Sequence, residues 1–258
     1  MSDTHDRWPS PDGGWTISIL ARERDSGRLG IAIAASSIAI GARCPLISVG
    51  KAVITSQGFT NLKLGPLAID LLRRGLAAEE VMVALRRHDR WVDFRQIAIV
   101  AEDGDIQAHT GVMNQSWAGH RVEGDAVSLG NGLADEAPLQ AMSAAYARHD
   151  RLPMAERLLV ALKQGAAVNV IRGVRQGAVS SALLVRAPSD LVQIDLRVDL
   201  ARAPPNAGGD AVADLDRVFK TYVPLVETYE RRSMAPEPGL VPASGPDDGV
   251  PPFLETQE

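Results

Sequence analysis

The sequence is short of several features that would define a function class at once. It holds a single cysteine, Cys44, so an intrachain disulfide framework and a multi-cysteine zinc or iron–sulfur site are excluded. The 27 Lys and Arg residues are outnumbered by 32 Asp and Glu residues, and the cationic clusters are pairs such as Arg73–Arg74. Because phosphate binding along a nucleic acid needs a concentrated basic face, we expect no nucleic-acid partner.

Long apolar segments are also missing. No run reaches the ~20 residues of a membrane-spanning helix, and residues 1–14 are polar with Pro and Gly, so we expect neither a membrane span nor a signal peptide. With one cysteine, this favours a cytoplasmic location. A content of 45% hydrophobic residues is typical of a globular protein. We predict a flexible leader (1–14), a folded domain (15–232) and a disordered tail (233–258) that is rich in Pro and acid.

The first regular pattern in the sequence is that of β-strands. Short β-branched runs separated by turn residues fill 15–57, a pattern typical of strands. Later hairpins are predicted at 94–111, around Asp103-Gly104, and at 178–199, around Pro188-Ser189-Asp190. A further short strand is expected at 125–131.

Helical periodicity follows each group of strands. The expected helices are 67–75, 77–88, 134–149, 153–163 and 211–231. This order predicts an α+β fold, with two packed sheets covered by helices on both outer faces, that is, a four-layer αββα sandwich. A Rossmann fold is disfavoured because no G-x-G-x-x-G opens a helix after a strand.

Thr16, at the start of the first strand, is a candidate nucleophile. A threonine hydroxyl needs a base, and the free α-amino group of the same residue, with an ordinary pKa of about 7.7 to 8.0, is one such base. That mechanism requires removal of residues 1–15. The alternative is an ordinary β-branched strand residue.

The segment after the strand that ends at Gln57 is a candidate oxyanion site. The backbone N–H of Gly58 and the side chains of Gln57 and Asn61 are possible donors to a developing negative charge. The alternative is a polar strand-to-helix loop with capping residues.

Two further polar residues are candidates for contacts to the substrate. Asn131 precedes an expected helix, where it is either the N-cap or a substrate contact, and the cap is the better interpretation from the residues alone. Ser36 follows the second strand and either orients the first-strand hydroxyl or only permits close packing.

His109, Thr110, Trp117 and His120 form the densest polar and aromatic stretch. They are predicted to line one pocket, with imidazole as a donor or acid and indole as an apolar wall. The alternative is a pair of structural histidines at strand ends. Because the histidine spacing fits no common ligand pattern, we expect no metal.

Several motifs in order resemble an uncharacterised bacterial family classed as Ntn-hydrolase-like (N-terminal nucleophile hydrolases). They are WTISILARERDSGRLGIAIAASSIAIGA, ITSQGFTNLKLGPLAIDLLRRG, AHTG with SWAGH, SLGNGLADEAPLQAM, and SSALLV with DLRVDL. The resemblance covers about residues 15 to 230. It implies the αββα sandwich and an amide-cleaving nucleophile at the tip of the first strand, which it places on Thr16. Family members read Met-Thr there, whereas Trp15 precedes Thr16 in this chain.

The resulting hypothesis is an amidohydrolase that cleaves a C–N bond in a small amide, cyclic amide, ureide or carbamoyl compound, without a cofactor. Thr16 would attack, and Gly58 and Asn131 would hold the oxyanion. One alternative is a non-catalytic small-molecule-binding or assembly protein with an intact leader. Another is a hydrolase whose base is a side chain such as His109. A homo-oligomer is left open.

Overall fold

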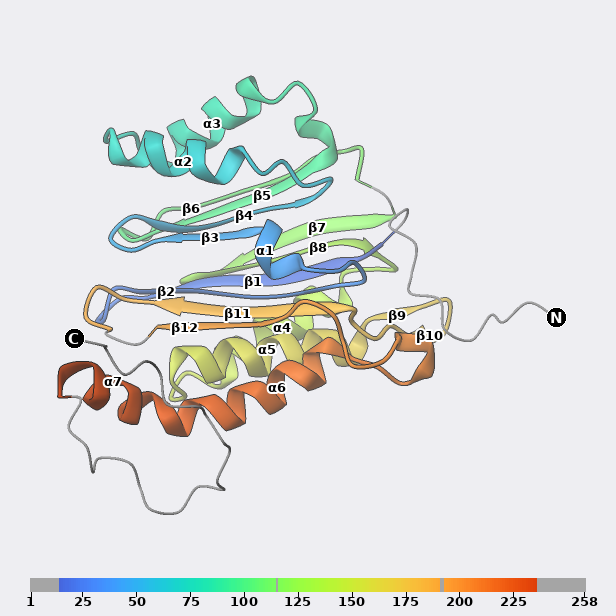
Figure 1. The fold of residues 1–258 in the computed structure, drawn as a ribbon. Coiled ribbons are helices and arrows are strands. Elements are labelled where there is room, and N and C mark those ends of the chain that lie inside the picture. Colours follow the sequence, from blue (N-terminus) through green and yellow to red (C-terminus); the bar gives the residue numbers. More distant parts are fainter. Residues whose placement is uncertain (1–13, 115, 191–192, 236–258) are drawn as a thin grey trace, which may run out of the picture.

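The fold combines helices with antiparallel sheets, so the predicted α+β class is confirmed (Figure 1). The computed structural model describes residues 14–114, 116–190 and 193–235. Its larger sheet has the strand order β12-β11-β2-β1-β8-β7, and a four-stranded sheet has the order β3-β4-β5-β6. The small β9-β10 hairpin forms the third sheet.

The six-stranded sheet is built around β1, which pairs antiparallel with β2 on one side and with β8 on the other. The chain reverses between β1 and β2 at Gly27, whose φ of +65° is a conformation that glycine adopts without steric cost. The strands of this sheet are β1 (Thr16–Glu23), β2 (Arg28–Ala35), β7 (Trp117–Glu123), β8 (Ala126–Leu133), β11 (Ser180–Arg186) and β12 (Ile194–Val198).

The four-stranded sheet is a meander in which each strand pairs with the next along the chain. Its strands are β3 (Pro45–Ser48), β4 (Ala52–Gly58), β5 (Arg95–Ala101) and β6 (Ile106–Thr110), and the small hairpin is β9 (Val170–Ile171) with β10 (Val174–Arg175). The predicted hairpin at 94–111 is confirmed by the pairing of β5 with β6.

Helices cover the outer face of each sheet (Figure 1). Two of them, α2 and α3, pack on the four-stranded sheet, and α4, α5 and α6 pack on the six-stranded sheet. The helices are α1 (Ile40–Arg43), α2 (Leu64–Arg73), α3 (Ala78–His88), α4 (Ala137–Arg148), α5 (Met154–Val168), α6 (Ala211–Tyr222) and α7 (Val226–Met234), with 3-10 turns η1 (Val92–Phe94), η2 (Pro205–Ala207) and η3 (Val223–Leu225).

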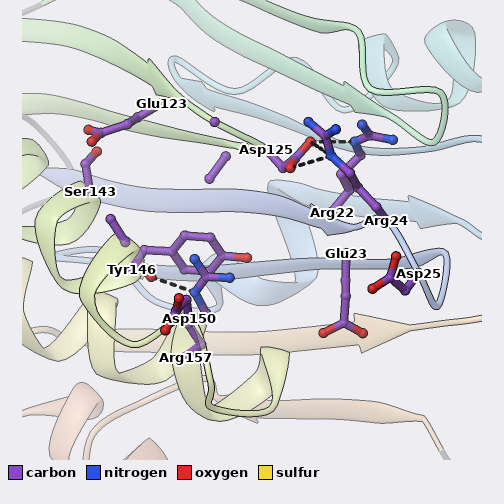
Figure 2. Close-up of a pocket in the computed structure, with 13 residues that line it drawn as sticks. Arg22, Glu23, Arg24, Asp25, Glu123, Asp125, Ser143, Tyr146, Asp150 and Arg157 are labelled. Carbon is purple, nitrogen blue, oxygen red and sulfur yellow. Dashed lines mark hydrogen bonds and ion pairs between the residues drawn. The ribbon is translucent and has the colours of Figure 1, made fainter.

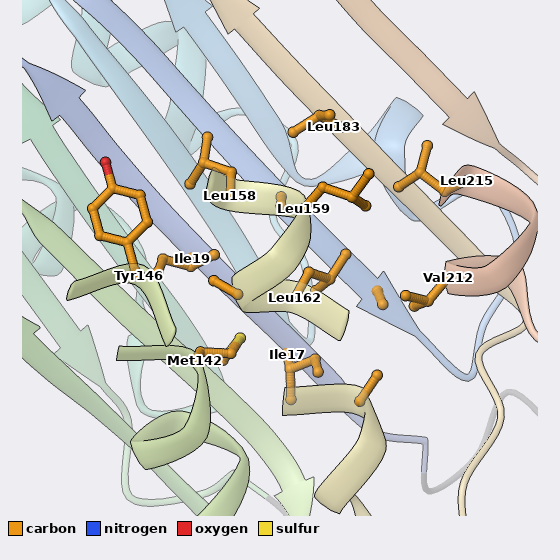
Figure 3. Packing of buried hydrophobic residues seen from close by; sticks show 14 of the residues in the cluster. Ile17, Ile19, Met142, Tyr146, Leu158, Leu159, Leu162, Leu183, Val212 and Leu215 are labelled. Carbon is orange, nitrogen blue, oxygen red and sulfur yellow. The ribbon is translucent and has the colours of Figure 1, made fainter. Parts of the chain in front are cut away.

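Alternation along β1 sends successive side chains to different cores. Ile17 and Ile19 pack with α4 and α5 in the cluster on the helical side (Figure 3). Leu20 belongs to a second cluster, which lies between the two sheets. A third cluster joins the four-stranded sheet to α2 and α3. Each sheet is therefore buried on both faces, which explains the near-continuous apolar run of β2.

Three expectations need correction. The helix predicted at 211–231 is interrupted after Tyr222, because Pro224 has no N–H to donate and a 3-10 turn forms there. Strand β7 was not predicted, since its residues are polar and exposed and its register shifts between Trp117 and Gly119. Regular structure continues to Met234, inside the predicted tail at 233–258.

The remainder of the predicted leader and tail, 1–13 and 236–258, lies outside the described residues. Within the ranges that the structure describes, no helix combines the length and the hydropathy needed to cross a membrane.

Candidate active site around Thr16

Thr16 is the first residue of the strand at the centre of the six-stranded sheet, with Ala35 on one side and Asn131 on the other. Because Ile17 faces the helices, the side chain of Thr16 faces the opposite sheet. The residue is 8% exposed. Its hydroxyl has no hydrogen-bond partner among the described residues, so this oxygen is not committed to the fold.

A buried hydrogen-bond network begins beside Thr16 and bridges the two sheets. Its central residue is Gln96 of β5, which is fully buried. Gln96 Oε1 accepts from Gln57 Nε2 at 2.7 Å and from Asn131 Nδ2 at 3.1 Å. Gln96 Nε2 donates to the backbone oxygens of Gly119 and Gly130 at 2.8 and 2.9 Å. One side chain therefore fixes strands from both sheets.

The network continues through two hydroxyls. Ser18 donates to Gln57 Oε1 at 2.7 Å. Thr110 Oγ1 lies 3.0 Å from Gln96 Nε2 and shares the two hydrogens of that amide with the Gly119 and Gly130 carbonyls. We call the whole set the inter-sheet network, and its members are Ser18, Gln57, Gln96, Thr110, His120 and Asn131. Buried amides that satisfy one another in this way are held rigidly, because an unpaired buried polar group is costly.

His120 closes the inter-sheet network. Thr110 Oγ1 lies 2.9 Å from His120 Nδ1. The tautomer of the imidazole sets which of these two atoms donates. Burial, and to a smaller extent the nearby His109, lowers the pKa of His120 below its ordinary value. The imidazole is therefore neutral at neutral pH.

Asn131 reaches this site as a strand residue. The prediction that it caps a helix is wrong, because Asn131 belongs to β8 and the next helix has Glu136 at its N-cap. Its Nδ2 donates one hydrogen bond to Gln96 Oε1. Since a carboxamide nitrogen carries two hydrogens, the second remains available beside Thr16.

Ser36 holds the residue that precedes Thr16. Its hydroxyl accepts from the Trp15 backbone N–H at 2.9 Å, and its own N–H donates to the Trp15 carbonyl at 3.0 Å. The Trp15 side chain is 4% exposed and belongs to the helical-side core. Gly132, with a φ of +69°, leaves room for this segment, since a Cβ there would collide with Gly14. In the intact chain, Trp15 is thus part of the fold.

Two residues of the predicted His109–His120 pocket lie elsewhere. His109 alternates with Thr110 along β6, so it points to the outer face of the sheet, where its Nε2 lies 3.2 Å from the Val92 carbonyl oxygen. Trp117 packs against the helical-side core. Thr110 and His120 alone face the space between the sheets. The prediction of one pocket is wrong, because these four side chains lie on different faces of the two sheets.

The outer position of His109 also affects its chemistry. Burial lowers the pKa of His109, partly offset by the Val92 carbonyl. Since the ring lies on the far side of the sheet from Thr16, it does not serve as the base for that hydroxyl. The hypothesis of a His109 base is not supported by this geometry.

The three oxyanion-site candidates at the end of β4 and in the segment after it take different positions. Gln57 belongs to the inter-sheet network, whereas Gly58 is exposed at the end of β4 and has a φ of +75°. A Cβ at Gly58 would approach the Phe94 carbonyl oxygen to 3.1 Å, so glycine is required there. Asn61 Nδ2 donates to Asp89 at 2.9 Å. Its side-chain oxygen accepts from the Lys63 N–H at 3.0 Å, so the amide of Asn61 is committed to its own turn.

Asp89, the partner of Asn61, is a buried carboxylate with a structural role. Burial raises its pKa, but the hydrogen bonds from Arg95 and Asn61 outweigh that effect and lower the pKa below its ordinary value. Arg95 Nε lies 2.9 Å from the Asp89 carboxylate. Asp89 therefore stays charged and holds the turn at 60–63.

Sequence reasoning missed the role of Gln96. The signal is present, because a glutamine that opens the buried run QIAIVA must find partners if it is buried. Nothing in the sequence says which partners those are, since they come from β4, β6, β7 and β8. Among the described residues, no group of three or more His, Cys, Asp or Glu side chains is arranged to hold a metal ion.

Comparisons with known proteins place this geometry in context. Residues 16–207 match the profile described as "Family of unknown function (DUF1028)". The crystal structure of protein SPO2555 from Silicibacter pomeroyi, which has the same family assignment, is 27% identical with a TM-score of 0.71, over 80% of this chain and 88% of that chain. Anbu (ancestral β-subunit) from Yersinia bercovieri is 12% identical with a TM-score of 0.36, over 80% of this chain and 96% of that chain. No curated protein matches the sequence.

Proposed function

The chain belongs to DUF1028, a family of unknown function, and we propose that it is an N-terminal nucleophile amidohydrolase that cleaves a C–N bond in a small amide, cyclic amide, ureide or carbamoyl compound. One observation carries this proposal: the unpartnered hydroxyl of Thr16 opens the central strand and faces a rigid network of amides. The order of layers, helices outside two packed sheets, supports an αββα sandwich of the Ntn type. The family match also begins at Thr16.

In the proposed reaction, Thr16 Oγ attacks the carbonyl carbon and its proton passes to the α-amino group of Thr16. The oxyanion accepts hydrogen bonds from the second N–H of Asn131 and from the backbone N–H of Gly58. Collapse of the tetrahedral intermediate breaks the C–N bond, and the leaving nitrogen takes the proton from the amine. Water then hydrolyses the Thr16 ester, which releases the acid and restores the hydroxyl.

The inter-sheet network supplies preorganisation. Gln96 fixes Asn131 by accepting one of its two hydrogens, so the other has a defined direction. Donors held in place before the reaction stabilise developing charge without reorganisation. Gln57 and Ser36 support the strand on either side of Thr16, and Thr110 positions the neutral His120 at the edge of the network.

The amine mechanism requires cleavage of the Trp15–Thr16 bond. In the intact chain this bond is the extension of β1, and both backbone groups of Trp15 are paired with Ser36. Mature protein would therefore carry Thr16 as its first residue. Intact mass of the purified full-length product measures this directly.

A second candidate function is non-catalytic binding or assembly on the same fold, with residues 1–15 retained. The burial of Trp15 in the helical-side core favours this alternative. It predicts an intact mass for the full chain and no turnover. Intact mass and turnover, measured together, distinguish the amidohydrolase from the non-catalytic protein.

The decisive experiment screens small amides, cyclic amides, ureides and carbamoyl compounds for release of ammonia or amine. We expect Thr16→Ser to keep part of the activity, because serine retains the hydroxyl and the amine, and Thr16→Ala to lose it. Thr55→Val is the matched control. Thr55 faces the space between the sheets, as Thr16 does, and its buried Oγ1 has no hydrogen-bond partner among the described residues. Wild-type turnover in Thr16→Ala removes Thr16 as the nucleophile.

A further inference from the structure

A pocket lies at the end of β1 opposite to Thr16, and Figure 2 shows the residues that line it. It has a volume of about 680 Å³ and is formed by the end of β1, the β7–β8 turn, α4 and the start of α5. This volume is within the range of small-molecule sites. Arg22 is the β1 residue of the pocket that lies nearest to Thr16 in the sequence. Six steps along a β-strand separate these two residues by about 20 Å, so the pocket is distinct from the proposed active site.

Tyr146 points its hydroxyl into this pocket (Figure 2). The residue is 6% exposed, and its ring is part of the helical-side core. Its hydroxyl has no hydrogen-bond partner among the residues that the structure describes. Burial raises the pKa of Tyr146, against a smaller opposing effect of Arg157, so the hydroxyl stays protonated and can donate. The ring is buried while the hydroxyl opens on the pocket, so this donor is available to an acceptor on a ligand.

Arg157 lies against the same ring. Its guanidinium carbon is 3.7 Å from the centroid of Tyr146, and its Nε donates to the Tyr146 carbonyl at 2.6 Å. These two contacts fix the plane of the guanidinium, while its terminal nitrogens have no ion-pair partner within the described ranges. A fixed guanidinium with free N–H groups is suited to bidentate binding of a carboxylate.

The remaining charges of the pocket are mostly negative. Five carboxylates and three guanidinium groups line it. Arg22 and Arg24 both bind Asp125, each at 2.9 Å, which leaves one positive charge on these three residues. Glu23 pairs with Arg28, and Glu123 pairs with Arg121. Asp25 and Asp150 are exposed and form no ion pair within the described residues. These two unpaired carboxylates, beside the fixed guanidinium of Arg157, favour a ligand that carries a positive group as well as a carboxylate.

We propose that this pocket binds a small zwitterion with one carboxylate and one ammonium group, namely a free α-amino acid. The carboxylate accepts from the Arg157 guanidinium and the Tyr146 hydroxyl, and the ammonium group faces Asp150 and Asp25. Binding at this site requires no activity at Thr16, so an experiment can refute either proposal without refuting the other.

Isothermal titration calorimetry of the full chain with each proteinogenic L-amino acid tests the proposal. We expect saturable binding of at least one amino acid. Its Nα-acetyl derivative, which lacks the ammonium group, and its α-carboxamide, which lacks the carboxylate, should each bind about tenfold more weakly or worse. Absence of saturable binding by every amino acid overturns the site, and equal affinity for the acetylated probe overturns the zwitterion.

Variants locate the binding. Tyr146→Phe keeps the ring and its packing, and should weaken binding about tenfold through loss of the hydroxyl. Asp150→Asn, on the surface, should weaken binding of the amino acid but leave the affinity for the Nα-acetyl probe unchanged. Glu79→Gln, an exposed residue on α3, is the charge control. Wild-type affinity in both Tyr146→Phe and Asp150→Asn, or lost affinity in Thr16→Ala, would place the ligand elsewhere.

Discussion

Gln96 offers the sharpest test of the inter-sheet network, because so many partners depend on it. Gln96→Ala removes the acceptor of Gln57 Nε2 and of Asn131 Nδ2. It also removes the donor to the carbonyls of Gly119 and Gly130. Thr110 keeps His120 as a partner. Four groups, of which the Gly119 carbonyl is half-buried and the other three are buried, therefore lose a hydrogen bond in one substitution.

The size of the effect follows from that count. A buried polar group left without a partner costs about 1 to 3 kcal/mol. Water entering the polar cavity would satisfy some of the four groups, so the lower end of the range applies to each. We expect Gln96→Ala to lower the free energy of unfolding by about 4 kcal/mol, a large fraction of the total for a typical domain.

Urea unfolding followed by circular dichroism measures this change, with Gln107→Ala as the control. Gln107 is the same residue type on the neighbouring strand, but it is half-buried. Its side chain has one hydrogen bond to the described part of the chain, with Asp105, so its loss should cost less than about 1 kcal/mol. Gln96→Glu should also destabilise at neutral pH, because a carboxylate accepts from Gln57 and Asn131 but cannot donate. A cost for Gln96→Ala no larger than that of the Gln107→Ala control would refute the reasoning.

Three further predictions concern stability. Thr55→Val should raise the free energy of unfolding by up to about 1 kcal/mol, and with it the thermal midpoint, because the buried Thr55 hydroxyl has no partner among the described residues. A lower midpoint would contradict this. Burial lowers the pKa of both His109 and His120, so the unfolded chain takes up protons first and the unfolding free energy should fall as pH drops below about 6.5. Urea titrations at several pH values should show a shallower fall in the double variant His109→Gln, His120→Gln, and an unchanged slope would oppose the assignment. Trp15→Ala should cost about 3 kcal/mol or more in urea unfolding of a chain that retains residue 15, whereas a product that begins at Thr16 should show no change.

Local sequence pattern was sufficient for most of the fold. The run at 28–35 is almost wholly apolar and forms β2, which is buried on both faces. Gly50 and Gly104, with positive φ, occupy the turns that join the strands of the second sheet. The pattern failed at β7, where polar and exposed residues form an irregular edge strand that period-2 alternation does not mark.

The site was harder to predict because its geometry depends on long-range pairing. Thr16 and Asn131 are far apart in sequence, and only the register of β1 with β8 places them opposite each other. His109 and Thr110 are adjacent in sequence, yet the pleat sends them to opposite faces. Proximity along the chain therefore predicted a pocket that the sheet divides, and gave no signal for Gln96, whose partners come from four strands.

Stability and chemistry can be separated at this site because the two depend on different atoms. The Thr16 hydroxyl has no partner in the described structure, so Thr16→Ala removes a reactive oxygen at little cost in folding free energy. Gln96→Ala removes the partners of residues on both sheets and affects stability as well as the position of Asn131. Loss of turnover with a wild-type unfolding curve in Thr16→Ala would therefore identify the attacking atom. A parallel loss of stability there would instead indicate a structural role for the threonine.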